Sequence, residues 1–278
     1  MTKSRITALA GWAGGKRTNA AKINAELGNP TRLFVPFAGG FPTLMTCPTE
    51  FYNDANWKPI AVLRALQEDA VRVGFLLAGR EFLKQEFEAA RDSLSLIDTH
   101  PYVSQALLAA DLLTVWWMGP GGIVGTTTKP WFAQRHTNTG GCPRKRWESF
   151  RASLPAIAER YEGVGLDCLD FRKFLGRIGD REGDAVYSDS PYFRKKFKYE
   201  VDFEPQDHID LAAILNGFKK ARVVVSYDDA PELVDLYPES KWRRVRIEMA
   251  KAMSHASGKS KRNTEILLVN DAGWEPTP

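Results

Sequence analysis

The sequence lacks the patterns of a metalloprotein, a disulfide-rich protein or a membrane protein. Its three cysteines, Cys47, Cys142 and Cys168, lie far apart and form no C-x-x-C pair, so neither disulfides nor a thiolate metal site are indicated. The four histidines have no second ligand type at metal spacing, and we expect no metal ion. The N-terminal segment has no apolar core of the signal-peptide kind, and the most apolar stretch, residues 105–118, is too short to span a bilayer. We therefore expect a cytoplasmic protein that contacts no membrane.

The sequence also has little excess of one charge, because its formal net charge is only +4. The basic residues are nevertheless clustered, at Arg144-Lys145-Arg146, at Arg194-Lys195-Lys196 with Lys198, at Arg243-Arg244, and at Lys259 with Lys261-Arg262. One such cluster is typical of a solvated face, whereas several together favour a polyanionic partner. With 44% apolar residues, a chain of 278 residues can bury a full core without a partner. We expect a monomer or a weak dimer.

Apolar runs and helical patterns alternate along much of the chain. Strands are predicted at residues 31–37, 50–53, 184–188, 222–227 and 265–270, and helices at 58–70, 206–219 and 230–237. The near-continuous apolar character of the strands is typical of parallel strands that are buried on both faces. Residues 242–249 alternate basic and apolar side chains, and we expect them to form an antiparallel pair with 265–270. The predicted fold class is α/β, a Rossmann-like and mostly parallel sheet with a terminal antiparallel pair.

The middle of the chain contains no strand pattern. Helices are predicted at residues 75–91, 101–118 and 146–162, and a stretch rich in Gly, Thr and Pro occupies 119–143. We interpret residues 73–163 as a helical insert that divides one Rossmann-like domain into two parts, 1–72 and 164–278.

The first candidate site is a glycine turn at the end of a predicted strand. It comprises Pro36-Phe37-Ala38-Gly39-Gly40, and the next strand ends at Asp54. Glycines allow a ligand to approach the backbone closely, and a carboxylate at a strand end can accept hydrogen bonds from ribose hydroxyls. By itself the pattern fits an ordinary turn and a helix-capping aspartate equally well.

A second candidate site is Asp189-Ser190-Pro191-Tyr192, which follows an apolar strand. This combination suits methylation of an exocyclic amine, whose lone pair is delocalised into the base ring and is a poor nucleophile. If Asp189 and the backbone carbonyl of Ser190 accept both N–H hydrogens, the lone pair becomes available to attack a sulfonium methyl group. Tyr192 can stack on a base that has left the helix. A plain proline turn would give the same four residues.

The third candidate site precedes the first helix, at Trp12-Ala13-Gly14-Gly15-Lys16. Its glycines and lysine could present N–H groups and a cation to an anionic ligand. It is not a phosphate-binding P-loop, because the first glycine is missing and Arg17 stands where Ser or Thr would bind Mg²⁺.

In this order, the three motifs resemble the Dam-type family of DNA adenine N6-methyltransferases. The resemblance implies S-adenosylmethionine as methyl donor and double-stranded DNA as partner. It assigns residues 12–16, 36–40 and Asp54 to the cofactor, with Asp170 and Phe171 near its adenine, and Asp189 to Tyr192 to catalysis. Lys16 lies near the cofactor or the flipped base. Residues 225–228 and 262–270 resemble later family segments to which we assign no role.

The resemblance also implies a DNA-contacting segment at residues 116–126 in the insert. Phosphate contacts are expected from Lys16, Arg144, Lys145, Arg146, Arg194, Lys195, Lys259 and Lys261. The sequence departs from the family at two places. Residues 119–123 replace the usual Asn-Gly pair, so no recognition sequence can be transferred. Ser190 replaces the usual first proline of the catalytic motif, which keeps the carbonyl acceptor but loses rigidity.

Other functions remain open from the sequence. The same catalytic residues would serve cytosine N4 or an RNA adenine, and the chain could be an inactive DNA-binding relic of the fold. A nicotinamide-dependent oxidoreductase would share the glycine turn and Asp54, but the full G-x-G-x-x-G is missing.

Overall fold

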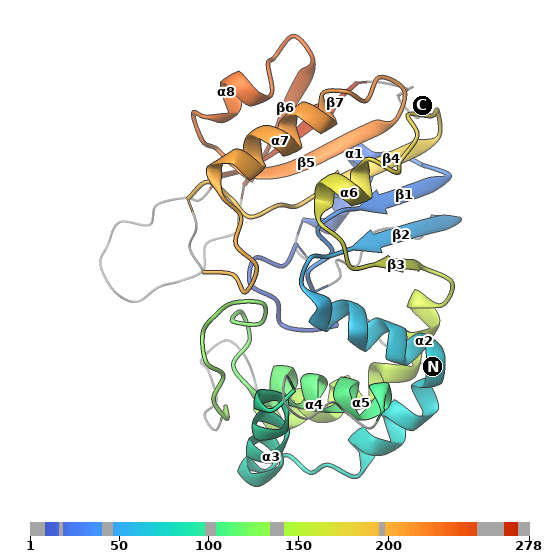
Figure 1. The fold of residues 1–278 in the computed structure, drawn as a ribbon, viewed down its shortest axis with the longest axis vertical. Coiled ribbons are helices and arrows are strands. Elements are labelled where there is room, and N and C mark those ends of the chain that lie inside the picture. Colours follow the sequence, from blue (N-terminus) through green and yellow to red (C-terminus); the bar gives the residue numbers. More distant parts are fainter. Residues whose placement is uncertain are drawn as a thin grey trace.

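A single seven-stranded sheet forms the centre of the computed structural model, which describes residues 9–16, 19–40, 47–97, 104–133, 142–194, 198–248 and 264–271. The strands are β1 (Arg32–Val35), β2 (Thr49–Asn53), β3 (Gly165–Asp167), β4 (Asp184–Ser188), β5 (Arg222–Asp228), β6 (Trp242–Glu248) and β7 (Thr264–Asn270). Their order is β3-β2-β1-β4-β5-β7-β6, and β1 to β5 are parallel. β7 runs antiparallel to both β5 and β6 (Figure 1). The predicted α/β class and the terminal antiparallel pair are confirmed.

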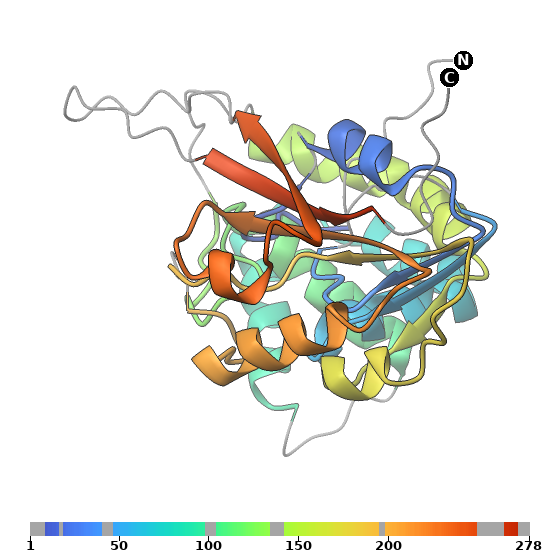
Figure 2. The same cartoon turned by 90° about the horizontal axis from the view of Figure 1, so that it is seen from above.

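The sheet is covered on both faces, as buried parallel strands require. Helices α6 (Phe171–Leu175), α7 (Pro205–Leu215) and α8 (Leu233–Leu236) cover one face, whereas α1 (Ala20–Leu27) lies on the other (Figure 2). Alternation along the strands feeds both cores: on β1, Phe34 packs on the side of α6 to α8, while Leu33 and Val35 pack on the opposite side. The near-continuous apolar runs follow from this arrangement.

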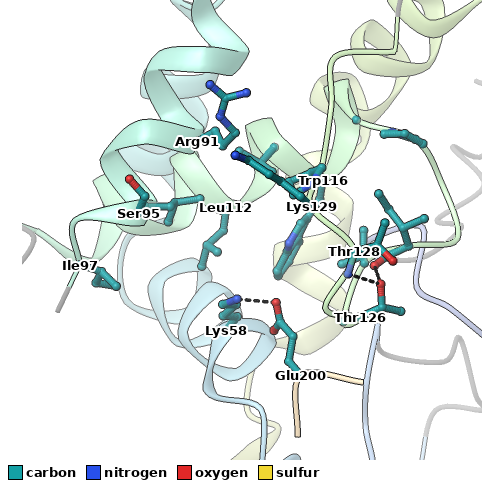
Figure 3. Close-up of a pocket in the computed structure, with 18 of the residues that line it drawn as sticks. Lys58, Arg91, Ser95, Ile97, Leu112, Trp116, Thr126, Thr128, Lys129 and Glu200 are labelled. Carbon is teal, nitrogen blue, oxygen red and sulfur yellow. Dashed lines mark hydrogen bonds and ion pairs between the residues drawn. The ribbon is translucent and has the colours of Figure 1, made fainter. Parts of the chain in front are cut away.

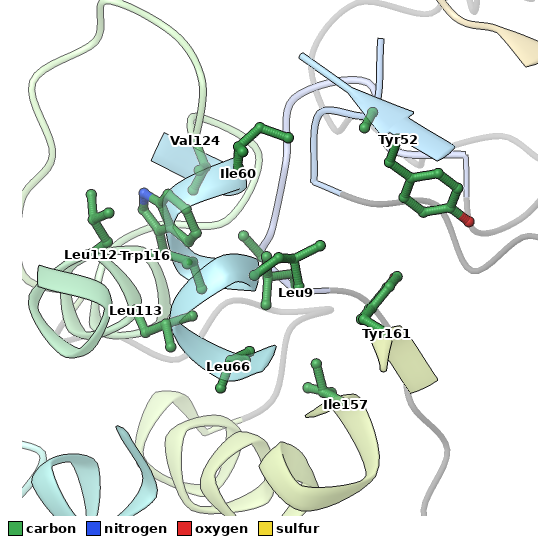
Figure 4. Packing of buried hydrophobic residues seen from close by; sticks show 14 of the residues in the cluster. Leu9, Tyr52, Ile60, Leu66, Leu112, Leu113, Trp116, Val124, Ile157 and Tyr161 are labelled. Carbon is green, nitrogen blue, oxygen red and sulfur yellow. The ribbon is translucent and has the colours of Figure 1, made fainter. Parts of the chain in front are cut away.

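Helices α2 (Trp57–Ala78), α3 (Lys84–Ser95), α4 (Gln105–Met118) and α5 (Pro143–Tyr161) form a helical layer beside the β3 edge of the sheet (Figure 1). Its core is continuous with the core of the sheet, because Leu9 and Tyr52 belong to the same buried cluster as Trp116 and Ile157 (Figure 4). The helical layer and the sheet therefore bury much of their apolar surface together. No helix in the described ranges is long and apolar enough to cross a membrane.

The predicted break between residues 70 and 75 was wrong, because α2 runs through it to Ala78. The only departure is at Asp69, whose φ of −153° and ψ of 72° are not helical. The end of α2 is stabilised by Arg151, whose guanidinium donates to the carbonyl oxygens of Leu77 (3.2 Å) and Ala78 (3.1 Å). Because Arg151 lies on α5, the local periodicity of α2 does not indicate this stabilisation.

Strand β3 was missed because it has three residues and starts with a glycine. An added Cβ at Gly165 would lie 2.5 Å from Cδ1 of Phe51 on β2. The glycine is therefore needed for the two strands to pair, although glycine usually argues against a strand.

Candidate active site

The three candidate motifs lie at one edge of the structure. β1 leads into residues 36–40, β2 into Asp54 and β4 into Asp189. Neighbouring parallel strands end at the same edge of a sheet, which is where ligands bind in open α/β folds. The N-terminal segment 9–16 reaches the same edge, where Trp12 contacts the glycine turn and Lys16 contacts Asp189 and Tyr192.

Asp54 holds the glycine turn in place. Its Oδ2 accepts a hydrogen bond from the Gly39 N–H (2.7 Å), and its Oδ1 accepts one from the Asn56 N–H (2.8 Å). Gly39 has a φ of 53°, in the left-handed region that favours glycine. Burial raises the pKa of the Asp54 carboxyl to about 6, although the two N–H groups lower it. The carboxylate retains lone pairs beyond these two bonds, which could accept hydrogen bonds from a hydroxyl-bearing ligand.

Asn53 is a buried residue of this site that sequence reasoning missed. Its side-chain amide donates to the carbonyl oxygens of Pro36 and Leu169, both at 3.0 Å, and its Oδ1 accepts from the Leu169 N–H at 2.9 Å. It therefore joins the glycine turn to the segment that follows β3. The signal was its position directly before Asp54, which by itself does not distinguish a ligand contact from a support.

Asp170 and Phe171 lie at the start of α6 and have different surroundings. Asp170 caps the helix, because its Oδ1 accepts from the Arg172 N–H (2.8 Å), and its Oδ2 pairs with the Arg172 guanidinium (3.0 Å). Its side chain remains 46% exposed. The Phe171 ring lies 5.5 Å from that of Phe37, which places an aromatic wall next to the glycine turn.

Trp12 packs between the glycine turn and the loop that follows α4. An added Cβ would lie 2.4 Å from the Trp12 Cβ at Gly40 and 2.3 Å from its Cζ2 at Gly125. The backbone on the same segment pairs with this loop, because the Ala13 N–H donates to the carbonyl oxygen of Val124 (3.2 Å). On the other side of the loop, Thr126 pairs with Tyr199. The N-terminal motif therefore links the glycine turn to the helical layer.

Lys16 lies beside Asp189 at the centre of a buried polar cluster. Its Nζ is 3.2 Å from Oδ1 of Asp189 and 2.5 Å from Oε1 of Glu265, and it also donates to the hydroxyl of Tyr192. The same Nζ lies 4.6 Å from the centroid of the Tyr192 ring. The Tyr192 hydroxyl donates to Oε1 of Glu265 at 2.5 Å. One ammonium group thus contacts two residues of the predicted catalytic motif.

Burial and the neighbouring charges shift the pKa values of the residues in this cluster. Burial raises the pKa of Asp189 to about 6, with Lys16 opposing the rise and Glu265 adding to it. For Lys16, burial lowers the pKa, but Asp189 and Glu265 outweigh it and the net pKa is raised. Burial also holds the pKa of Tyr192 well above its usual value. Near pH 7 the cluster therefore combines an ionised Asp189, a protonated Lys16 and a neutral Tyr192.

Glu265 is the main residue of the site for which the sequence suggested no role. Besides Lys16 and Tyr192 it contacts Asn19, whose amide donates to Oε2 at 2.5 Å. The signal that could have revealed it is a carboxylate at the start of a buried apolar strand. Because β7 is antiparallel to β5, its beginning lies at the edge where β5 ends.

The predicted phosphate-contacting residues have mixed positions. Arg144 and Lys145 are exposed at the start of α5, and Arg146 is half-buried near Gly121. Arg194 is exposed two residues after Tyr192. Three others, Lys195, Lys259 and Lys261, lie outside the described residues.

A cavity of about 490 Å³ lies in the helical layer, between α3, α4 and the loop after α4 (Figure 3). Its lining includes Trp57, Trp116, Arg91 and Lys129, as well as the Lys58–Glu200 ion pair, whose atoms are 2.6 Å apart. None of the predicted cofactor or catalytic residues lines it. It is therefore separate from the cluster around Asp189.

In the part of the chain that the structure describes, no group of three or more His, Cys, Asp or Glu side chains could hold a metal ion.

Comparison with known proteins agrees with the geometry. No curated protein matches the chain. A family model described as D12 class N6 adenine-specific DNA methyltransferase matches residues 131–253, a region that contains the whole catalytic motif from Asp189 to Tyr192. This match supports the predicted resemblance of the chain to S-adenosylmethionine-dependent DNA adenine N6-methyltransferases.

Proposed function

We propose that the protein methylates N6 of an adenine that has been flipped out of double-stranded DNA, at a recognition sequence read by residues 73–163. The observation that carries the proposal is the position of Asp189. It lies at the carboxyl end of β4, is raised in pKa by burial, and is paired with Lys16 in a cluster that also holds Tyr192. This is an acceptor that remains ionised near pH 7 in a partly buried site.

The glycine turn fits the methyl donor. Residues 36–40, with Asp54 on the ribose and Phe171 near the adenine ring, would hold S-adenosylmethionine, and residues 12–16 would close the site from the other side. When bound, the donor supplies an electrophilic methyl group on a sulfonium. A carboxylate that keeps lone pairs beyond its two bonds to backbone N–H groups is suited to two ribose hydroxyls.

The protein residues act on the target amine. The Oδ atoms of Asp189 and the carbonyl oxygen of Ser190 accept its two N–H hydrogens, which directs the nitrogen lone pair at the methyl group. Tyr192 offers a ring for stacking once the base leaves the helix. Lys16 now donates to both Asp189 and Tyr192, so the arriving amine competes with it for the Asp189 carboxylate.

Transfer of radiolabelled methyl from S-adenosylmethionine to unmethylated DNA, followed by digestion to nucleosides, tests this proposal. We expect label in N6-methyladenine, and a loss of about 10²- to 10⁴-fold in turnover for Asp189→Ala, the scale of positioned catalytic groups. Cofactor binding should survive in that variant. Label in N4-methylcytosine, or transfer to RNA alone, would show that the substrate is cytosine in DNA or adenine in RNA instead. Cofactor and DNA binding without any label would identify an inactive relic.

A further inference from the structure

Ser190 occupies the position at which the Dam-type family has a proline, and its side chain is hydrogen-bonded to the neighbouring strand β5. Ser190 is 2% exposed, and its Oγ donates a hydrogen bond to the hydroxyl of Tyr227 on β5 at 2.9 Å. Tyr227 is fully buried. A proline ring restricts the backbone by covalent geometry, whereas a serine can be restricted by fixing its side chain.

The Tyr227 hydroxyl is itself fixed from the far side. Nδ1 of His208, on α7, lies 2.9 Å from it, and His208 is 2% exposed. The tautomer of His208 sets which of the two groups donates in this hydrogen bond. A serine, a tyrosine and a histidine thus form a buried chain of hydrogen bonds that runs from the catalytic motif to α7.

The other end of the catalytic motif rests on the same two residues. The Phe193 ring, directly after Tyr192, stacks on His208 with a centroid distance of 3.9 Å and an interplanar angle of 18°. It also lies 5.4 Å from the Tyr227 ring. Tyr227 and His208 therefore hold the chain on both sides of Pro191 and Tyr192.

We infer that Tyr227, oriented by His208, is a positioning residue that fixes the backbone at Ser190 and replaces the rigidity of the family's proline. The inference rests on the proposed function, in which the Ser190 carbonyl accepts one N–H of the target amine. A shift of that carbonyl weakens the contact to the reacting amine and leaves the cofactor, which other residues hold, unaffected. Tyr227 acts through Ser190 and does not touch the substrate.

Tyr227→Phe removes the acceptor and leaves the Ser190 hydroxyl buried without it. We expect kcat to fall about 5- to 150-fold, the range for an unsatisfied buried polar group, while the KM for S-adenosylmethionine stays unchanged. In a Ser190→Pro background the same substitution should cost little, because proline needs no hydroxyl partner. If Ser190→Pro lowers the melting temperature too far, Ser190→Ala replaces it: the Ser190→Ala/Tyr227→Phe double variant should be no slower than the slower single variant.

Tyr187→Phe is the matched control. It removes a phenolic hydroxyl from the adjacent strand β4, where Tyr187 is also fully buried and its hydroxyl lies 3.0 Å from Oγ of Ser226. We expect a similar loss of thermal stability with kcat retained. Equal losses of kcat in the serine and proline backgrounds, or an unimpaired Tyr227→Phe, would overturn the inference. A wild-type protein that transfers no methyl would instead refute the proposed function.

Discussion

Lys16 and Glu265 are 249 residues apart in the sequence, yet their Nζ and Oε1 atoms form a buried ion pair 2.5 Å apart. Asp189 also contacts this ammonium, with its Oδ1 3.2 Å from Nζ. One cation is therefore shared between a carboxylate that supports the site and a carboxylate that we propose binds the target. We therefore expect Glu265 to influence how strongly Lys16 competes with the target amine for Asp189.

Replacing this supporting carboxylate should change both the rate and its pH dependence. In Glu265→Gln, Lys16 keeps Asp189 as its charged partner and binds it more strongly, so we expect kcat at pH 8 to fall about 10-fold, the loss expected of one charge-assisted contact. The pKa of Asp189 should also fall, since Glu265 contributes to its rise. Rate measurements across pH would then place the acidic decline at lower pH than in the wild type.

Glu50→Gln provides the control for a buried glutamate outside the site. Glu50 is 5% exposed and pairs with Arg160 at 2.9 Å. We expect it to lower the melting temperature and leave the pH profile unchanged. A shift of the profile in both variants would show that the effect is general and would contradict the role of Glu265.

The wild-type protein should lose activity in acid as Asp189 becomes protonated. Its pKa is raised to about 6, so kcat at saturating S-adenosylmethionine should rise as the pH increases through about 6 and then level off. The ionised form is required because the protonated carboxyl loses acceptor capacity. Asp54 also has a pKa of about 6, so the affinity for the cofactor should weaken as the pH falls through about 6. Separate measurements of kcat and of the cofactor Kd distinguish the two groups, and a kcat independent of pH between 5 and 8 would exclude Asp189 as the acceptor.

The sheet and the edge that carries the site could be predicted from sequence because their signals are local. A few consecutive residues are enough to recognise each of these features: the apolar strands, the glycine turn and residues 189–192. The long helix α2 was divided in the wrong place because its end depends on Arg151 from α5. β3 was missed because its glycine is required by Phe51, a residue far away in the sequence.

The support of the site could not be predicted for a similar reason. Glu265 and Asn19 act through Lys16, and Tyr227 acts through Ser190, so each role exists only after the strands have been placed side by side. Asp54 has a local signal, but its bonds to Gly39 and Asn56 show that it also fixes the turn. Sequence reasoning found residues proposed to touch ligands and missed the residues that hold them.

Asp54→Ala should weaken the binding of S-adenosylmethionine. The substitution removes the proposed ribose acceptor and the bond that holds the Gly39 N–H, so we expect the Kd to rise at least about 10-fold, the loss of one charge-assisted hydrogen bond. At saturating cofactor, kcat should change far less than in Asp189→Ala. Isothermal calorimetry measures the Kd directly, and an unchanged value would reject the role of Asp54 at the cofactor.

Gly125→Ala should disturb the contact between Trp12 and the loop after α4. Gly125 has a φ of 83°, and an added Cβ would lie 2.3 Å from Cζ2 of Trp12. Gly122→Ala is the matched control, because its φ of 81° imposes the same backbone strain but no atom lies within 4 Å of the new Cβ. We expect Gly122→Ala to lower the melting temperature by about 2–4 °C, as for about 1 kcal/mol, and Gly125→Ala to lower it further and to raise the KM for cofactor. Equal effects would mean that the packing of Trp12 has no role beyond backbone strain.

The exposed basic residues at the start of α5 should contribute to DNA affinity through phosphates. Each phosphate contact steepens the dependence of log K on log salt by about 0.9, so the Arg144→Ala/Lys145→Ala double variant should make the slope shallower by about 2. Lys173→Ala, an exposed lysine on α6 at the opposite part of the molecule, serves as the control for loss of positive charge (Figure 1). Fluorescence anisotropy of a labelled duplex over a salt series gives the slopes. If the double variant binds more weakly with the same slope as the wild type, these two residues do not neutralise phosphates, and the DNA must lie against another part of the helical layer.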